Sequence, residues 1–155
     1  MTAEQIIEAY KLQAHPEGGY FAELYTAPLA LGSVEGERSL GGSIYFLLKQ
    51  QDISHFHIID CEELWYYHSG CGLQLYLLSP EGRLETRRLG LAVEQGEAPL
   101  VVIPKGYCFA AENLDQEGYT FVSCVTMPRF RYEGFRLVPY GELQQFGVER
   151  RLCLE

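Results

Sequence analysis

The sequence predicts an all-β domain, a barrel or sandwich of short strands with a short helix at each end. Its 155 residues include 16 glycines, which are scattered between short apolar runs. Turn signals recur about every 8–12 residues, a spacing typical of antiparallel strands joined by hairpins. Apolar residues make up 47% of the chain, which is enough for a packed core. We therefore expect a single domain over residues 1–155.

The first expected element is a short amphipathic helix over about residues 3–13. Thr2 and Gln5 have the spacing of a capping box, and apolar side chains then recur at near-helical intervals. The sequence HPEGGY at 15–20 follows. There Pro16 ends the helix, and two glycines permit backbone conformations that are closed to other residues.

The barrel strands are expected over about residues 20–138. The residues from Pro28 to Gly42, with several glycines and charges between them, are expected to form a loop and are a candidate flap. Leu100–Ile103 lies between two prolines and is expected to be a short buried strand, and Tyr140–Phe146 to make one or two helical turns. The other β-prone runs are Tyr20–Thr26, Ser43–Leu48, Tyr119–Val125 and Phe135–Val138.

Charge and composition exclude two classes of partner. The formal net charge is −9, with only 12 Lys and Arg against 21 Asp and Glu, so we expect no nucleic-acid binding. No apolar run approaches the roughly 20 residues that cross a bilayer, so we expect no membrane span. The five cysteines are odd in number and lack C-x-x-C spacing. The chain also starts with an acidic, amphipathic segment that is unlike a secretory signal. We therefore expect a cytoplasmic protein whose cysteines are free thiols.

Residues with chemical potential gather between positions 54 and 70. Three of the four histidines and the single tryptophan lie there. Because side chains alternate along a strand, His55 and His57 are expected to share one face. The next strand is expected to present one face formed by Glu63, Trp65 and Tyr67. If these strands pair or stack, two imidazoles and a carboxylate converge.

Two sets of residues resemble the two signatures of the cupin superfamily. The first set is His55-x-His57, a glutamate after five more residues, and Gly70. The second set is Gly96, Pro104-x-Gly106 and Asn113. The resemblance is closer still to one small single-domain family, cupin family five, whose function is uncharacterised. The elements that carry it are His15 to Tyr25, Ile44 to Leu48, Ser54-x-Phe56-His57, Glu63-x-Trp65, Leu89-Gly90, Val102 to Gly106, Val122 to Cys124 and Phe130 to Phe135.

This resemblance implies a cupin jelly-roll-like double-stranded β-barrel, usually a homodimer, with a small-molecule pocket. It implies no known reaction. Two positions depart from the pattern. Phe109 stands where most cupins have their last metal-binding histidine, and Ala22 stands where the family commonly has arginine. For the acidic position we choose Glu63 over Glu62, because Glu63 belongs to the Glu-x-Trp element.

The first hypothesis for the site is a divalent metal. His55, His57 and Glu63 would supply the two imidazoles and one carboxylate of the facial triad that suits Fe(II), as in a metal-dependent oxygenase. The same donors also bind Zn, Mn or Ni. Because Phe109 removes the fourth ligand, we assign no cofactor.

The second hypothesis is an isomerase or epimerase that uses no metal and acts on a sugar-like or other small polar substrate. His57 paired with Glu63 would be the base. Tyr45 or Tyr67 would be the acid, as the resemblance to sugar-epimerising cupins implies. The barrel-lining stretches hold almost no Arg or Lys, so we expect a neutral or polar ligand.

The third hypothesis is a sensor or carrier that binds a small molecule without catalysis. An aromatic cage with a few polar anchors is the ordinary lining of such a pocket. The candidate ligand-binding residues are Glu17, Tyr20, His55, Trp65 and Tyr67, beside the catalytic candidates His57, Glu63 and Tyr45. The sequence leaves open whether the protein is an enzyme. Exposed strand edges and the surplus of aromatic residues favour a homodimer.

Overall fold

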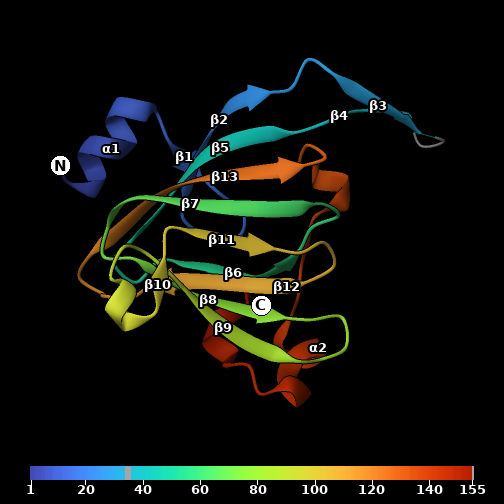
Figure 1. Cartoon of the computed structure of the whole chain (residues 1–155). Helices are drawn as coiled ribbons and strands as arrows, with labels where there is room; N and C mark the ends of the chain where they lie inside the picture. Colours follow the sequence, from blue (N-terminus) through green and yellow to red (C-terminus); the bar gives the residue numbers. More distant parts are fainter. Residues whose placement is uncertain (34–35, 155) are drawn as a thin grey trace.

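The computed structural model describes residues 1–33 and 36–154, which form two six-stranded β-sheets (Figure 1). The first sheet contains, in order, β1 (Gln13–Ala14), β2 (Tyr20–Thr26), β5 (Gly42–Lys49), β13 (Tyr119–Met127), β7 (Glu62–Gly70) and β11 (Leu100–Ile103). The second contains β10 (Glu97–Ala98), β9 (Leu84–Leu89), β8 (Leu73–Leu78), β12 (Cys108–Asn113), β6 (Ile53–Ile58) and β14 (Arg136–Leu137). A separate hairpin pairs β3 (Ala30–Ser33) with β4 (Gly36–Ser39).

The main core lies between the two sheets. Phe46 and Trp65 come from the first sheet and Leu75 and Phe109 from the second, and all four are almost fully buried in one cluster. On most strands every second side chain points into this core, as the pleat of a strand requires. The predicted all-β jelly-roll is therefore confirmed.

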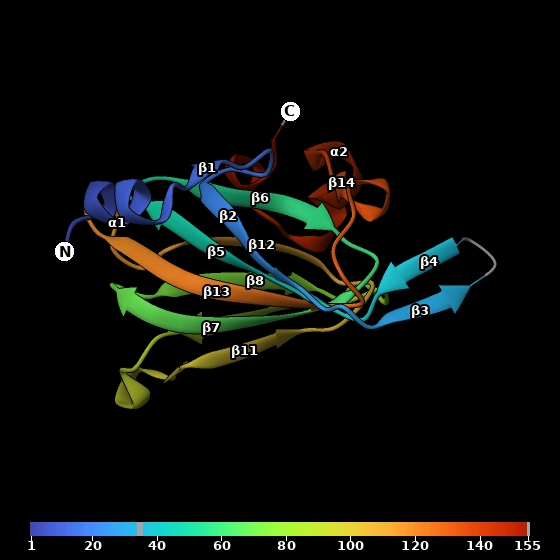
Figure 2. The ribbon, with the colours of Figure 1, turned by 90° about the horizontal axis from the view of Figure 1, so that it is seen from above.

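The two ends of the chain cover the outer faces of the sheets (Figure 2). Helix α1 (Ala3–Tyr10) packs Ile6 against Leu47 and Phe121 of the first sheet. The predicted capping box between Thr2 and Gln5 is present. Three short C-terminal turns cover the second sheet: α2 (Tyr140–Leu143), η3 (Gln144–Phe146) and η4 (Arg150–Leu152). No helix in the described residues is long and apolar enough to cross a membrane.

Two elements differ from the sequence prediction. The expected loop from Pro28 to Gly42 contains the β3–β4 hairpin, and residues 34–35 of this candidate flap lie outside the described residues. Arg38 in β4 binds both carboxylate oxygens of Asp60, at 3.1 and 2.8 Å, which ties the hairpin to the turn before β7. Strand β11, expected to be buried, is half-exposed: Val101 and Ile103 are buried, whereas Leu100 and Val102 lie on the exposed outer face of the first sheet.

Candidate functional site

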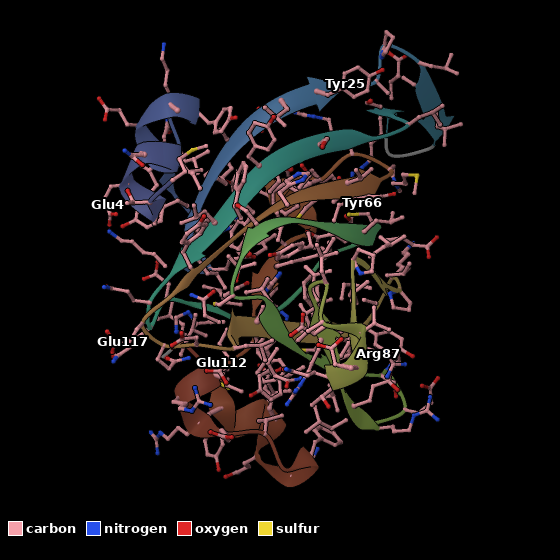
Figure 3. The ribbon with its side chains drawn as sticks, turned by 60° about the vertical axis from the view of Figure 1, so that its left-hand side comes forward. Glu4, Tyr25, Tyr66, Arg87, Glu112 and Glu117 are labelled. Carbon is pink, nitrogen blue, oxygen red and sulfur yellow. The ribbon has the colours of Figure 1, made fainter. Side chains whose placement is uncertain are left out.

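A cavity lies between the two sheets, and its lining includes Thr26 at the end of β2 and Gly42 at the start of β5. The β3–β4 hairpin projects from this end of the sheets (Figure 2). The centres of water-sized molecules have about 50 Å³ of room in the cavity, and the whole space including the open mouth is about 670 Å³. Its polar interior is formed by His15, Glu17, His57, Glu63, Trp65 and Cys124. Its apolar walls include Phe21, Phe46, Ile59 and Phe130. The more exposed side chains Glu23, Tyr25, Arg129 and Tyr132 form the rim, and Tyr25 is seen at the end of β2 in Figure 3.

A β-bulge in β6 determines which of its side chains face this cavity. His57 pairs with Phe109 of β12 and Ser54 with Ala111, so two residues of β6 stand opposite the single Ala110. The bulge shifts the alternation by one position. Ser54 and His57 therefore both reach the cavity side and bind the same carboxylate. The expected shared face of His55 and His57 is wrong for this reason.

Glu17 and His57 form a buried ion pair. Oε2 of Glu17 lies 2.9 Å from Nε2 of His57, and the two residues are only 6% and 2% exposed. Oε1 of Glu17 accepts a 2.9 Å hydrogen bond from the Ser54 hydroxyl. Nδ1 of His57 lies 2.7 Å from the carbonyl oxygen of His55. A carbonyl oxygen only accepts, so Nδ1 carries a proton, and both imidazole nitrogens of His57 are engaged.

The two partners shift each other's pKa in opposite directions. Burial alone would raise the pKa of Glu17, but the charge and hydrogen bond of His57 outweigh burial and hold it below its ordinary value. Burial alone would lower the pKa of His57, but Glu17 outweighs it and raises the pKa. Each partner therefore favours the charged form of the other, the Glu17 carboxylate and the His57 imidazolium.

The turn that carries Glu17 is held by hydrogen bonds to β6. The carbonyl oxygen of Glu17 accepts from the backbone N–H of His55 at 2.8 Å and from its Nδ1 at 2.7 Å. Gly18 has φ +112°, and a Cβ there would lie 1.8 Å from the carbonyl oxygen of Ile53. Only glycine fits this close approach. The glycine after Glu17 therefore fixes the position of the carboxylate.

His15 enters the cavity as a neutral imidazole. Its Nδ1 accepts a 3.1 Å hydrogen bond from the backbone N–H of Glu17, so Nδ1 carries no proton. Burial lowers the pKa of His15 despite the nearby Glu17 carboxylate. Its Nε2–H remains as a hydrogen-bond donor.

Glu63 is the second carboxyl group of the cavity, and its environment differs from that of Glu17. It is 7% exposed. Burial and the negative charge of Glu17 raise its pKa to about 7, although His57, the Cys124 thiol and the Trp65 indole partly offset the rise. Burial also raises the pKa of Cys124 well above its ordinary value, so the thiol stays protonated. Glu63 is thus close to half-protonated at neutral pH.

The structure brings four of the eight sequence-predicted site residues into the cavity: Glu17, His57, Glu63 and Trp65. The other four, Tyr20, Tyr45, His55 and Tyr67, are not among the lining residues. The expected partner of His57 is also corrected. The carboxylate that binds its Nε2 is Glu17, not Glu63.

Three of the four displaced residues have clear physical reasons. Tyr20 and Tyr45 belong to the outer cluster beneath α1, because their neighbours Phe21 and Phe46 take the inner face. Tyr67 packs against the main core from the same side as Trp65, but its hydroxyl donates to the carbonyl oxygen of Gly70, at the other end of β7.

His55, the fourth displaced residue, is turned away from the cavity by the bulge.

The residues present do not fit a cupin-type metal. His55, His57 and Glu63 do not converge, since Nδ1 of His55 is engaged by Glu17 and both nitrogens of His57 are bonded. Phe109 packs on the His57 ring with centroids 4.2 Å apart, in the position where a further ligand was expected. Among residues 1–33 and 36–154, no three His, Cys, Asp or Glu side chains are grouped to hold an ion.

Sequence and structure comparisons place this geometry in a family. A sequence profile described as Cupin superfamily (DUF985) matches residues 4–138. The chain belongs to this cupin family. The resemblance to cupin family five is therefore confirmed.

Relatives of this cupin extend to bacteria and eukaryotes. It is similar to protein SO0799 of Shewanella oneidensis, with a TM-score of 0.90 and 35% identity over 99% of this chain and 98% of that one. A hypothetical protein from Leishmania major gives a TM-score of 0.85 at 30% identity, covering 99% and 97%. An uncharacterized yeast protein of Saccharomyces cerevisiae, YML079W, is 29% identical over 147 residues, which is 85% of this chain and 73% of that protein. None of these names states a ligand or a reaction.

Several lining residues of this cupin were not assigned to the site from its sequence. His15 was visible in the HPEGGY element, and its cavity position follows from the turn that this element makes. The segment after β13 supplies Arg129, Phe130 and Tyr132. Phe130 belongs to the family pattern, which was the available signal for this segment. Its approach to the cavity depends on long-range packing.

Proposed function

We propose that this cupin binds a small organic molecule between its sheets and moves a proton on it, as an isomerase or epimerase does. The observation that carries the proposal is the contrast between two carboxyl groups in one cavity. The pKa of Glu17 is held below its ordinary value, whereas that of Glu63 is raised to about 7. Pairs of groups whose environments separate their pKa values are typical of acid–base assignments.

The proposed roles follow from the hydrogen bonds. Glu17 is the base, because it is ionised at neutral pH and lines the cavity. Glu63 is the acid, because it holds a proton near neutral pH. His57 is a positioning residue. Both of its nitrogens are engaged, so it orients Glu17 and keeps it ionised without reaching the substrate.

Deuterium exchange tests this proposal. A thermal-shift screen of small sugars, polyols and carbonyl compounds identifies ligands that raise the melting temperature. Each such ligand is then incubated with enzyme in D₂O and followed by proton NMR. We expect exchange at one carbon position, reduced about 10²–10⁴-fold by Glu17→Gln and by Glu63→Gln. Glu62→Gln is the matched control, since Glu62 is the exposed neighbour of Glu63 on β7. Wild-type exchange rates in Glu17→Gln would refute the assignment of the base.

A second candidate function is binding without catalysis. The observation that favours it is the aromatic wall of Phe21, Phe46, Trp65 and Phe130, with few polar groups among them. In this case a ligand raises the melting temperature but shows no exchange above the rate without protein. The same experiment therefore separates the two candidates.

A further inference from the structure

The indole N–H of Trp65 is a buried donor that makes no hydrogen bond of ordinary geometry. Trp65 is 1% exposed and lines the cavity. Its Nε1 is the one buried side-chain N or O atom that lacks a hydrogen-bond partner in the part of the chain that the structure describes. Leaving such a group unpaired costs roughly 1–3 kcal/mol, and native proteins rarely do so. An acceptor supplied by a ligand would remove this cost.

The orientation of this indole is fixed by its neighbours. Its ring meets Phe46 at 5.5 Å between centroids with planes 66° apart, and Phe109 at 6.3 Å with planes 85° apart. Cys124 stands opposite Trp65 in the pairing of β13 with β7. The donor is therefore held in place and cannot turn to find another partner.

Glu63 lies beside the same N–H. It precedes Trp65 by two positions on β7, so both side chains point to the inner face. The indole N–H and the Cys124 thiol lie near enough to the Glu63 carboxyl group to lower its pKa as weak hydrogen-bond donors. The indole contact falls outside ordinary hydrogen-bond geometry, so a better-placed acceptor can replace it. When Glu63 is protonated, its O–H is a second donor in the same part of the cavity as the indole N–H.

We propose that the Trp65 indole N–H and the Glu63 carboxyl together bind the carbonyl oxygen of the substrate, which is a small aldehyde or ketone with a hydrogen on the adjacent carbon. The substrate class rests on the proposed proton transfer, whereas the oxygen site rests on Trp65 and Glu63 alone. A carbonyl oxygen has two lone pairs and no proton, so it matches a site that offers two donors.

The proton transfer balances with these groups. The C–H bond beside the carbonyl breaks, and its proton passes to the Glu17 carboxylate. The electron pair of that bond forms a C=C bond, and the π pair of the C=O bond moves onto the oxygen, giving an enolate. The N–H of Trp65 and the O–H of Glu63 stabilise the negative oxygen, as preorganised donors do. Return of this proton by Glu17 to the same carbon restores the substrate and exchanges its hydrogen with solvent. When the adjacent carbon carries a hydroxyl, Glu63 gives its proton to the enolate oxygen and takes the proton of that hydroxyl. Glu17 then returns its own proton to the former carbonyl carbon, which isomerises the substrate and leaves both carboxyl groups as they began.

The charges of the cavity favour a neutral carbonyl compound over a carboxylate. The interior holds the Glu17–His57 pair, whose charges cancel, and Glu63, which is partly ionised. At the rim Arg129 lies 3.5 Å from Glu23, so the positive charge there is also offset. A carboxylate ligand would meet no net positive charge.

NMR of the single tryptophan tests the oxygen site directly. The ¹⁵N-labelled protein contains one indole N–H, so its cross-peak needs no assignment. We would titrate hydroxyacetone, cyclohexanone and acetophenone, each against the alcohol of the same skeleton: 1,2-propanediol, cyclohexanol and 1-phenylethanol. We expect at least one ketone to move the indole proton downfield in a saturable manner, and its alcohol partner to move it much less. If no ketone moves the peak more than its alcohol does, the proposal is wrong.

The pH dependence gives an independent readout. With a pKa near 7, Glu63 is protonated about ten times more often at pH 6 than at pH 8. Ketone affinity should therefore fall by up to about tenfold between these values, and Glu63→Gln should remove the dependence. Equal affinity of the wild type at both pH values would overturn the role of Glu63.

Two outcomes separate this inference from the proposed function. Saturable ketone binding at Trp65 without any exchange of the adjacent hydrogens for deuterium would refute the proposed reaction and support the oxygen site. Exchange that persists in Trp65→Phe, with an unmoved indole peak in the wild type, would support the reaction and refute the oxygen site.

Discussion

Glu17 and His57 are joined across the molecule by a 2.9 Å contact between Oε2 and Nε2. Glu17 comes from the turn between β1 and β2, and His57 from β6 in the opposite sheet. The pair therefore links the two sheets at the cavity. The same contact holds Glu17 ionised in an environment where burial alone would favour its protonated form.

Replacing Glu17 should change the protonation of His57. Without the carboxylate, burial is no longer outweighed, so in Glu17→Gln the pKa of His57 should fall below the ordinary value. The remaining proton should stay on Nδ1, which binds the His55 carbonyl. ¹⁵N NMR of the imidazole at pH 7 measures this, with two protonated nitrogens expected in the wild type and one in the variant. Glu62→Gln should match the wild type, and an imidazolium that survives in Glu17→Gln would contradict the pairing.

Gly18→Ala should destabilise the fold and displace Glu17. The new Cβ would meet the Ile53 carbonyl oxygen at 1.8 Å, and φ is +112°. We expect a loss of about 2–4 kcal/mol in the free energy of unfolding, measured by urea denaturation. Gly141→Ala is the matched control, because a Cβ at this position in α2 meets nothing within 4 Å. Equal stabilities of the two variants would show that the turn is not tightly packed.

Glu63 should make the protein less stable as pH rises. Its pKa is raised from 4.5 to about 7 on folding, so between these values the folded state holds a proton that the unfolded state has lost. The stabilisation from that proton is complete below pH 4.5 and is lost as pH rises through about 7. The difference amounts to roughly 3 kcal/mol. The stability gain of Glu63→Gln over the wild type should therefore grow from pH 4.5 to pH 7 and then level off. A constant difference would contradict the raised pKa.

The homodimer expected from the sequence stays a prediction. Exposed apolar side chains lie along the outer face and edge formed by β13, β7 and β11, and Tyr66 is visible there in Figure 3. Leu100 stands opposite Tyr66 in the strand pairing. We expect light scattering to give twice the 17.6 kDa mass of the chain, and Val102→Lys to give the single mass. Leu154→Lys, near the C-terminus, is the control and should leave the dimer intact. A wild-type protein with the mass of one chain at tens of micromolar would refute the predicted dimer.

Much of the fold was predictable because local signals agreed with the tertiary structure. The capping box at Thr2, the turn glycines and the apolar runs each specify a local conformation. The 28–42 segment was mispredicted because glycines and charges also suit an exposed hairpin. The edge position of β11 depends on which strands pair, and this is not a local property.

The site was predicted only in part, because alternation does not identify the inner face of a strand covered on both sides. In β5, Phe46 faces the cavity and Tyr45 lies beneath α1. Both residues are aromatic, so their types do not show which one faces inward. In β6, the bulge reverses the alternation between Ser54 and His57. Neither effect has a signal in the residues themselves. Glu17, by contrast, was found because it belongs to a family element.

The most direct test of the account is a ¹³C NMR titration of the two cavity carboxyl groups, assigned by the loss of one signal each in Glu17→Gln and Glu63→Gln. The account predicts a midpoint near 7 for Glu63 and a midpoint below 4.5 for Glu17. Midpoints near 4.5 for both groups, or a higher value for Glu17 than for Glu63, would contradict it.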